Sequence, residues 1–390
     1  MDPQPFQIHL DQAVLDDLKV RLARSRPPPP IEAKSWESGP DPDWMRGLID
    51  YWRDGFDWRA QEAALNRFAH FRAEVDGTDI HYIREPGRGE RPLPILLTHG
   101  FPDSFARFLK LIPLLTDPEA HGGEAADAFE VIVPSLPGYG FSGPPADGGI
   151  FKVADLWHGL MTQVLGFRRY GAHGGDWGST VTEGLMRQHA GDLVGIHLTD
   201  VPFWHAFRKP GKLTAAEARY FEAIEDFQTK GQGAYAMIQG ARPLALADGL
   251  NDSPLGLAAW IVEKFERWSD CGGAVERAFS KDELLTNVTI YWGTQTIGSS
   301  FQPYADLMQA GPLHWIGEVA REKLGAADTP TGFAMFPKDL SHPPREWAER
   351  FFNVQRWTDM PHGGHFAAME APDLLAGDIR AFFRPLRHPQ

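Results

Sequence analysis

The stretch Gly171–Thr180, GAHGGDWGST, carries the most information about the fold of this chain. It continues the run RRYGAHGG, which has the pattern of a buried strand, and it precedes VTEGLMRQH, which has the pattern of a helix. Gly174 and Gly178 flank Asp176 in the spacing G-x-D-x-G. Close glycines are needed where a strand turns sharply into a helix, because larger side chains would clash. The pattern therefore predicts a strand–turn–helix that presents Asp176 at the carboxyl end of a sheet, as a nucleophile elbow presents serine.

A second interpretation of the same stretch gives Asp176 a purely structural role. An aspartate directly before a helix commonly caps it, because its side chain accepts hydrogen bonds from the first free N–H groups. The pentapeptide alone does not separate a cap from an elbow, so the rest of the chain has to decide between them.

The segments around this stretch alternate between short apolar runs and helical patterns. FRAEVDGTDIHYIREPG predicts a hairpin with its turn at Asp76 and Gly77. The runs PILLTHG, FEVIVPSLPG, RRYGAHGGD and LVGIHLTD have the pattern of buried strands that end in loops. LKLIPLL and residues 153–166 supply helices between them. This alternation predicts an α/β fold, in which helices flank a mostly parallel sheet.

Two helical regions interrupt the alternation and divide the chain into four segments. Residues 1–73 form an N-terminal helical meander, in which VLDDLKVRLARS is amphipathic and RPPPP stops its helix. Residues 74–201 carry the first part of the sheet, and residues 202–312 form a helical cap inserted into it. Residues 313–390 carry the second part, with TGFAMFPKDL and FNVQRWTDM as strands and PDLLAGDIRAFFRPL as the last helix.

Composition limits the partners and the location of the protein. The net charge of −14 over 390 residues disfavours nucleic acid and anionic membranes. With one cysteine, Cys271, the chain forms neither an internal disulfide nor a cysteine-based zinc site. We find no signal peptide, and no segment reaches the roughly 20 apolar residues that span a bilayer. We therefore expect a cytoplasmic protein without a membrane anchor. The sequence does not decide whether the protein is a monomer or a homo-oligomer.

The chemistry of a carboxylate at an elbow indicates the class of substrate. A serine that attacked an sp³ carbon would form an ether, which water does not cleave. An aspartate that attacks an sp³ carbon forms an alkyl ester, and water can then attack the carbonyl of that ester. Asp176 therefore favours epoxides or alkyl halides over esters and amides.

Such a cycle needs a histidine to activate water and an acid to orient the histidine, in the order nucleophile, acid, histidine. HGGHFAAMEAPDLL supplies His365 after two glycines and just before the last helix, with His362 as a nearby competitor. Asp339 follows the strand GFAMF and is the favoured acid, and Asp200, at the end of the strand VGIHLT, is the second candidate.

THGFPDSF, residues 98–105, follows the strand PILL at the place where an oxyanion hole is built. We expect the backbone N–H groups of Phe101 and Trp177 to form this hole, and His99 to be structural. GYGFSG, residues 138–143, matches a dinucleotide fingerprint, but prolines follow at once where such a fold needs a helix. No cofactor and no metal is therefore predicted.

With HGFP, GYGFS, GGDWGS and GGHFAA in this order, the chain resembles the epoxide hydrolases of the α/β-hydrolase superfamily, most of all the microsomal and juvenile-hormone type. The similarity extends through the meander and the cap. It implies an α/β-hydrolase fold, a soluble form of the enzyme and an ether hydrolase that turns an apolar epoxide and water into a vicinal diol. It also implies that two cap tyrosines, Tyr235 and Tyr304, donate hydrogen bonds to the epoxide oxygen.

The chain departs from that family pattern at three places. QGARP replaces an expected Thr-Lys-Pro after the first cap tyrosine, Gln295 replaces a usual glycine, and Asp200 replaces an expected asparagine. The first two changes lie near the cap and bear on substrate shape. Because of the third change, the sequence does not decide whether Asp200 contributes, beside Asp339, to orienting His365.

Two rival hypotheses belong to other functional classes. A haloalkane dehalogenase would share the fold, the aspartate and the tryptophan after it, but it commonly needs a side-chain donor at the position of Phe101, which has none. A non-catalytic ligand receptor would share the fold, because fold does not fix function. Such a receptor often loses part of the relay, whereas every expected group is present here.

Overall fold

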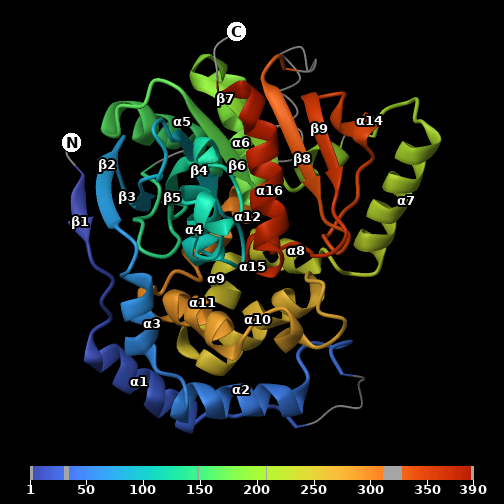
Figure 1. Cartoon of the computed structure of the whole chain (residues 1–390). Helices are drawn as coiled ribbons and strands as arrows, with labels where there is room; N and C mark the ends of the chain where they lie inside the picture. The colour runs from blue at the N-terminus through green and yellow to red at the C-terminus, as the bar shows by residue number, and fades with distance from the viewer. Residues whose placement is uncertain (1–2, 30–34, 147–148, 208, 311–326, 388–390) are drawn as a thin grey trace.

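The computed structural model describes residues 3–29, 35–146, 149–207, 209–310 and 327–387 of the chain (Figure 1). Within this part a single sheet runs through the molecule in the strand order β1-β2-β3-β5-β4-β6-β7-β8-β9. Its strands are β1 (Gln4–Phe6), β2 (His70–Val75), β3 (Thr78–Glu85), β4 (Leu93–Thr98), β5 (Phe129–Pro134), β6 (Tyr170–Gly174), β7 (Leu193–Leu198), β8 (Pro330–Met335) and β9 (Asn353–Asp359).

The sheet is mostly parallel, as the alternation of patterns predicts. The strands from β5 to β9 pair in parallel, and β1, β2 and β3 add an antiparallel edge. The hairpin of β2 and β3 turns at Asp76 and Gly77, both with positive φ, of 46° and 78°. Positive φ at both central residues is the twist that a two-residue hairpin needs, which is why Asp-Gly marks it in the sequence.

The structure corrects the expectation that everything before residue 73 is helical or irregular. Gln4–Phe6 pairs with β2 and extends the sheet by one edge strand, and β2 itself begins at His70. A strand of three residues shows no alternation of apolar and polar side chains, so its pairing leaves no signal in the local sequence.

Helices cover both faces of the sheet, and each face has its own apolar core (Figure 1). The helix α6 contacts β4, β6 and β7 and packs beside α5, whereas α16 contacts β7 and β8 and packs beside α4. These helices are α4 (Leu111–Thr116), α5 (Val153–Gly159), α6 (Trp177–Gln188) and α16 (Pro372–Phe383). Because helices bury both faces, β6 and β7 are buried along their whole length rather than alternating between buried and exposed residues.

A helical cap lies between β7 and β8 in the sequence; in space α9, α10 and α11 lie beyond one end of the sheet, whereas α7 stands beside its β9 edge (Figure 1). Its helices are α7 (Ala215–Thr229), α8 (Ala234–Ala241), α9 (Pro243–Asp252), α10 (Pro254–Arg267), α11 (Lys281–Thr294) and α12 (Gln302–Ala310). Capping boxes at Thr214 and Ser280 begin α7 and α11. The expected boundary between residues 312 and 313 lies outside the described residues.

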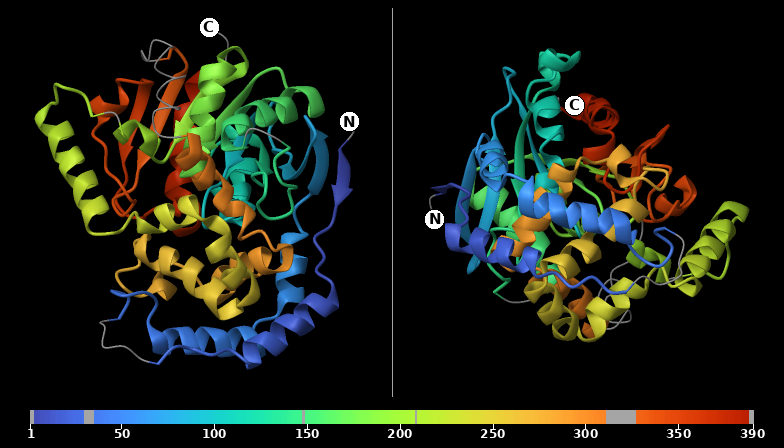
Figure 2. Two further views of the ribbon diagram at one scale, coloured as in Figure 1. Left: turned by 180° about the vertical axis from the view of Figure 1, so that it is seen from behind. Right: turned by 90° about the horizontal axis from the view of Figure 1, so that it is seen from below.

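The N-terminal helices run across the far side of the cap (Figure 2). They are α1 (Gln12–Ala23), α2 (Pro42–Asp54) and α3 (Trp58–Leu65). Trp52 of α2 is buried, and its indole N–H donates to the hydroxyl of Thr289 on α11 at 3.1 Å. The meander is therefore joined to the cap by a buried polar contact as well as by apolar packing. None of the helices in the described ranges is long and apolar enough to cross a membrane.

We predict that Trp52→Phe lowers the free energy of unfolding by about 1–3 kcal/mol, because it leaves the fully buried Thr289 hydroxyl without its donor. Trp44→Phe is the matched control on the same helix. The Trp44 indole N–H also donates to a cap residue, Glu276, but this contact is exposed to water, so its loss costs about 0.5 kcal/mol or less. Urea unfolding of both variants tests this, and equal losses would contradict it.

Candidate active site

The turn between β6 and α6 has the geometry of an elbow. Asp176 has φ 58° and ψ −129°, a sparsely populated conformation that costs on the order of 1–3 kcal/mol. The chain segments around it are in close contact: a Cβ on Gly174 would lie 2.1 Å from the carbonyl oxygen of Gly178, and a Cβ on Gly178 would lie 2.0 Å from that of Thr98. Glycine is therefore required at both positions that the sequence pattern singles out.

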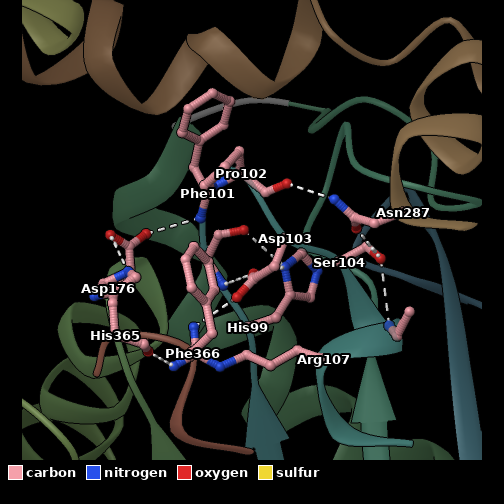
Figure 3. Close-up of polar contacts among 12 residues, drawn as sticks. His99, Phe101, Pro102, Asp103, Ser104, Arg107, Asp176, Asn287, His365 and Phe366 are labelled. Atoms are coloured by element: carbon pink, nitrogen blue, oxygen red, sulfur yellow. Dashed lines mark hydrogen bonds and ion pairs between the residues drawn. The ribbon is translucent and has the colours of Figure 1, made fainter. Parts of the chain in front are cut away.

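The alternative role of Asp176 as a helix cap is wrong. Its carboxylate makes no capping hydrogen bond to α6, although it stands at the N-terminus of that helix. Oδ1 instead accepts a hydrogen bond from the backbone N–H of Phe101 at 2.8 Å (Figure 3). A Cβ on Gly100 would lie 2.1 Å from this same oxygen, so the loop after β4 can approach only because it carries glycine.

His365 faces two carboxylates from opposite sides of its ring. Nδ1 lies 2.7 Å from Oδ1 of Asp339, and Nε2 lies 3.5 Å from Oδ2 of Asp176. Because a carboxylate only accepts, Nδ1 carries the proton of the first contact and Nε2 points to the elbow. His365 is buried and His362 is exposed, so the structure brings together the residues that the sequence analysis favoured.

The carboxylates of Asp339 and Asp176 and the imidazole of His365 stabilise one another's charged forms. Burial disfavours the charged imidazole, but the carboxylates of Asp339 and Asp176 outweigh burial and raise the pKa of His365 to about 10. Burial likewise opposes ionisation of Asp339, and the adjacent His365 reverses the effect, so that the pKa of Asp339 is lowered. The resting site therefore holds an imidazolium between two carboxylates at neutral pH.

Asp200, the second candidate for the acid, contacts the elbow and not the histidine ring. Oδ1 accepts the backbone N–H of Asp176 at 3.0 Å, and Oδ2 lies 2.8 Å from the hydroxyl of Ser179. Asp339 is thus the carboxylate that is hydrogen-bonded to His365, while Asp200 holds the backbone that carries Asp176.

The loop after β4 points the N–H of Phe101 at the elbow, and a buried ion pair supports the shape of this loop. Asp103 accepts the N–H of Gly100 at 2.9 Å and pairs with Arg107 at 2.6 Å, and both side chains are almost fully buried. Arg107 also donates to the carbonyl oxygen of His365 at 2.5 Å, which ties the loop that carries His365 to the loop after β4 (Figure 3). The sequence analysis missed this pair, although a carboxylate followed by arginine four residues later was visible.

The cap is anchored to the same loop. Asn287 of α11 donates to the carbonyl oxygen of Pro102 at 2.8 Å and accepts from the Ser104 hydroxyl at 2.9 Å (Figure 3). Tyr291, one turn further along α11, donates to the carbonyl oxygen of Asp103 at 2.8 Å. These contacts join residues more than 180 positions apart, and no local pattern in the sequence reveals them.

His99 satisfies the backbone of this region, in agreement with the structural role expected for it. Its Nε2 accepts the N–H of Leu136 at 3.0 Å, and Nδ1 lies 3.0 Å from the carbonyl oxygen of Gly100. Both ring nitrogens are used in this way, so the imidazole has no free position for chemistry.

The two cap tyrosines lie over the elbow from α8 and α12. The ring centroids of Tyr235 and Tyr304 are 5.9 Å apart, and that of Tyr304 is 5.0 Å from Trp177. Burial first, and then the Asp176 carboxylate, raises the pKa of Tyr235; burial, Tyr235 and Asp176 raise that of Tyr304 well above its usual range. Both phenols therefore stay protonated and are hydrogen-bond donors at neutral pH.

The surroundings of these polar groups are aromatic. Phe101 stacks near Tyr235, and Trp268 packs on both Tyr235 and the His365 ring. Phe301 packs edge-on against Phe101. In the ranges that the structure describes, no cluster of three or more His, Cys, Asp or Glu side chains could hold a metal ion.

Comparison with known proteins gives a consistent result. Residues 3–108 match the family model for the epoxide hydrolase N terminus, and residues 94–195 match the α/β-hydrolase fold. Epoxide hydrolase 1 of Sus scrofa is 36% identical over 97% of this chain and 88% of its own length. Juvenile hormone epoxide hydrolase 2 of Ctenocephalides felis is 33% identical, over 96% and 84%. The crystal structure of the Bombyx mori juvenile hormone epoxide hydrolase superposes with a TM-score of 0.86 at 26% identity, over 99% of this chain and 95% of that one.

We predict that Gly178→Ala lowers the free energy of unfolding by about 3 kcal/mol, because the new Cβ would overlap a backbone oxygen that cannot move without breaking β4. Gly377→Ala in α16 is the control, since nothing lies within 4 Å of a Cβ there. This control is expected to gain up to about 1 kcal/mol from its higher helix propensity. Urea unfolding measures both, and an unchanged Gly178→Ala variant would disprove the tight elbow.

Proposed function

This chain belongs to the epoxide hydrolases of the α/β-hydrolase fold, and we propose that it opens an apolar epoxide to a vicinal diol through an alkyl ester on Asp176. One observation carries the proposal: the Asp176 carboxylate sits between a backbone N–H donor, a histidine–aspartate pair and two protonated cap phenols. The aromatic surroundings favour an apolar substrate.

The first step forms the ester. Oδ1 of Asp176 is held by the Phe101 N–H, which leaves Oδ2 to attack an epoxide carbon. As the carbon–oxygen bond of the ring breaks, negative charge develops on the ring oxygen. Tyr235 and Tyr304 donate hydrogen bonds to that oxygen, and the proton that finally neutralises it is drawn from the imidazolium of His365. An epoxide is a weak electrophile without such donors, so the phenols contribute to the rate of this step.

The second step cleaves the ester with water. Alkylation removes the negative charge of Asp176, which is one of the two carboxylates that hold His365 protonated. The pKa of His365 therefore falls once the ester forms, and the neutral imidazole, oriented by Asp339, can take a proton from water. Water attacks Cγ of Asp176, and the charge that develops on Oδ1 faces the N–H groups of Phe101 and Trp177. Collapse breaks the bond from Cγ to Oδ2, and the departing diol oxygen takes the proton from His365. The carboxylic acid left at Asp176 then gives its proton to His365, which restores the carboxylate and the imidazolium.

We predict that His365→Gln stops the cycle after the first step, because water is no longer activated while Asp176 remains a nucleophile. Intact-protein mass spectrometry after incubation with styrene oxide is expected to show a gain of one substrate mass. The Asp176→Ala variant, which lacks the attacking carboxylate, is expected to show none.

The outcomes of that experiment separate the competing hypotheses. An adduct from a haloalkane with none from a panel of epoxides would overturn the proposal in favour of a dehalogenase. No adduct from either class, with reversible binding intact, would favour a ligand receptor.

We predict that Tyr235→Phe and Tyr304→Phe each slow ester formation by about 10²-fold, and that the double variant is slower still, since each phenol contributes a donor to the leaving oxygen. Ester hydrolysis, measured in the same single-turnover experiment, is expected to change little. Tyr82→Phe is the control, because Tyr82 is a fully buried tyrosine whose hydroxyl has no partner within the described ranges. Equal rates for all these variants would show that the cap phenols do not act on the ring oxygen.

A further inference from the structure

Asp200 closes a ring of hydrogen bonds around the elbow. Its Oδ1 accepts the backbone N–H of Asp176 at 3.0 Å. Its Oδ2 lies 2.8 Å from the hydroxyl oxygen of Ser179, in the first turn of α6. The same hydroxyl oxygen lies 2.7 Å from the carbonyl oxygen of Asp176. The carbonyl oxygen also accepts the backbone N–H of Ser179 at 3.0 Å. This pair of side chains therefore contacts both backbone polar groups of the strained residue, and it is one of two supports of the carbonyl.

The donors and acceptors available in this ring of hydrogen bonds indicate whether Asp200 is protonated. A backbone carbonyl only accepts, and a serine hydroxyl has one proton to donate. If Asp200 were ionised, two acceptors, its own Oδ2 and the carbonyl of Asp176, would compete for the single proton of Ser179. If Asp200 is protonated on Oδ2, it donates to Ser179, and Ser179 donates to the carbonyl. Every contact in the ring then has one donor and one acceptor.

We propose that Asp200 is a positioning residue that holds the elbow as a neutral carboxylic acid, and that its ionisation at higher pH slows hydrolysis of the alkyl ester. The second clause rests on the proposed function. The neutral acid offers one donor and one acceptor, as the amide of asparagine does. This explains how aspartate can occupy a position at which the family pattern leads us to expect asparagine.

The groups that face Asp200 agree with this assignment. Burial, and then the Asp339 carboxylate, raise the pKa of Asp200 to about 7, and Asp176 adds to the effect. The Ser179 hydroxyl and His365 oppose it. The guanidinium of Arg107 approaches Gly175 from the same side as Asp200, but it is paired with Asp103.

The remaining neighbour is Tyr220 of α7, whose pKa is raised by burial to above its usual range and which is therefore neutral. Among the residues that the structure describes, the groups around Asp200 thus include two carboxylates, and no unpaired cation other than the shared His365 faces it. A negative charge on Asp200 is therefore unfavourable, and Asp200 ionises at a higher pH than an aspartate in water.

Ionisation of Asp200 has two consequences for the second step. The carboxylate can no longer donate to Ser179, so the backbone of Asp176 loses part of its support. The new charge also favours the protonated form of His365, and less of the neutral base is then present in the alkyl-enzyme. Both effects act in the same direction on ester hydrolysis.

Infrared difference spectroscopy tests the protonation without any substrate. Between about pH 5 and about pH 9 the wild type is expected to lose a protonated carboxyl band that Asp200→Asn lacks, because aspartates in solution ionise near 4. In Ser179→Ala the band is expected to shift, since the acceptor of its proton is gone. A wild-type spectrum identical to that of Asp200→Asn over this range would overturn the proposal.

Single-turnover hydrolysis of the alkyl-enzyme tests the consequence. Asp200→Asn is expected to match the wild type near pH 6 and to be faster where Asp200 is ionised while His365 is still largely protonated in the alkyl-enzyme. The gain there is up to about tenfold, which corresponds to a difference of about one unit in the pKa of His365. Asp200→Ala, which removes the donor and the acceptor, is expected to be slower at every pH. Recovery of the low-pH rate by asparagine but not alanine separates the hydrogen-bond pattern from simple packing.

Asp192→Asn serves as the charge control. Asp192 precedes β7, Asp200 follows its other end, and the Asp192 side chain is 43% exposed. Its variant is expected to keep the wild-type pH profile. If the alkyl-enzyme forms but the rate of its hydrolysis depends on pH in the same way in Asp200→Asn and in the wild type, the inference is overturned. Failure of the proposed function would instead appear as no adduct in His365→Gln, with the infrared result unaffected.

Discussion

The active site depends on a backbone turn that only a particular set of glycines permits. Asp176 adopts φ 58° at the end of β6, and the neighbouring chain segments approach it so closely that Gly100, Gly174 and Gly178 leave no room for a Cβ. This turn aims the carboxylate away from its own helix and toward the N–H of Phe101. The contact of Asp176 with His365, which is in turn bonded to Asp339, requires that direction.

Much of the fold and of the candidate site could be predicted from patterns of residues that are close in the sequence. The elbow, the strands and the order of Asp176, Asp339 and His365 follow from short patterns, because a turn or a buried strand imposes its requirements on consecutive residues. The pairing of Asp103 with Arg107 and the anchoring of the loop by Asn287 were not predicted. The i,i+4 spacing of the first pair is local, but it does not reveal that the pair is buried. The partner of Ser104 is chosen by tertiary approach over 183 residues, and ordinary polar side chains carry no local mark of it.

The cap and the core share one loop, and this has a mechanical consequence. Asn287 and Tyr291 of α11 hold the carbonyl groups of Pro102 and Asp103, next to the N–H that faces the nucleophile. Arg107 holds the same loop to the backbone of His365. A shift of α11 would therefore be transmitted both to the oxyanion site and to the histidine loop. The cap in this arrangement does more than cover the substrate, because its position and the geometry of the core are set together.

The charges buried at the site also form one system. With Asp200 neutral, the carboxylates of Asp103, Asp176 and Asp339 face Arg107 and a protonated His365, which leaves one uncompensated negative charge. In the proposed cycle, esterification moves that charge onto the opened ring oxygen, and a proton drawn from His365 neutralises it. The imidazole becomes a base at the moment when the ester needs one, and the cluster keeps its net charge. An ionised Asp200 would add a second uncompensated charge and hold the proton on His365, so a neutral acid at this position is what allows one histidine to serve both steps.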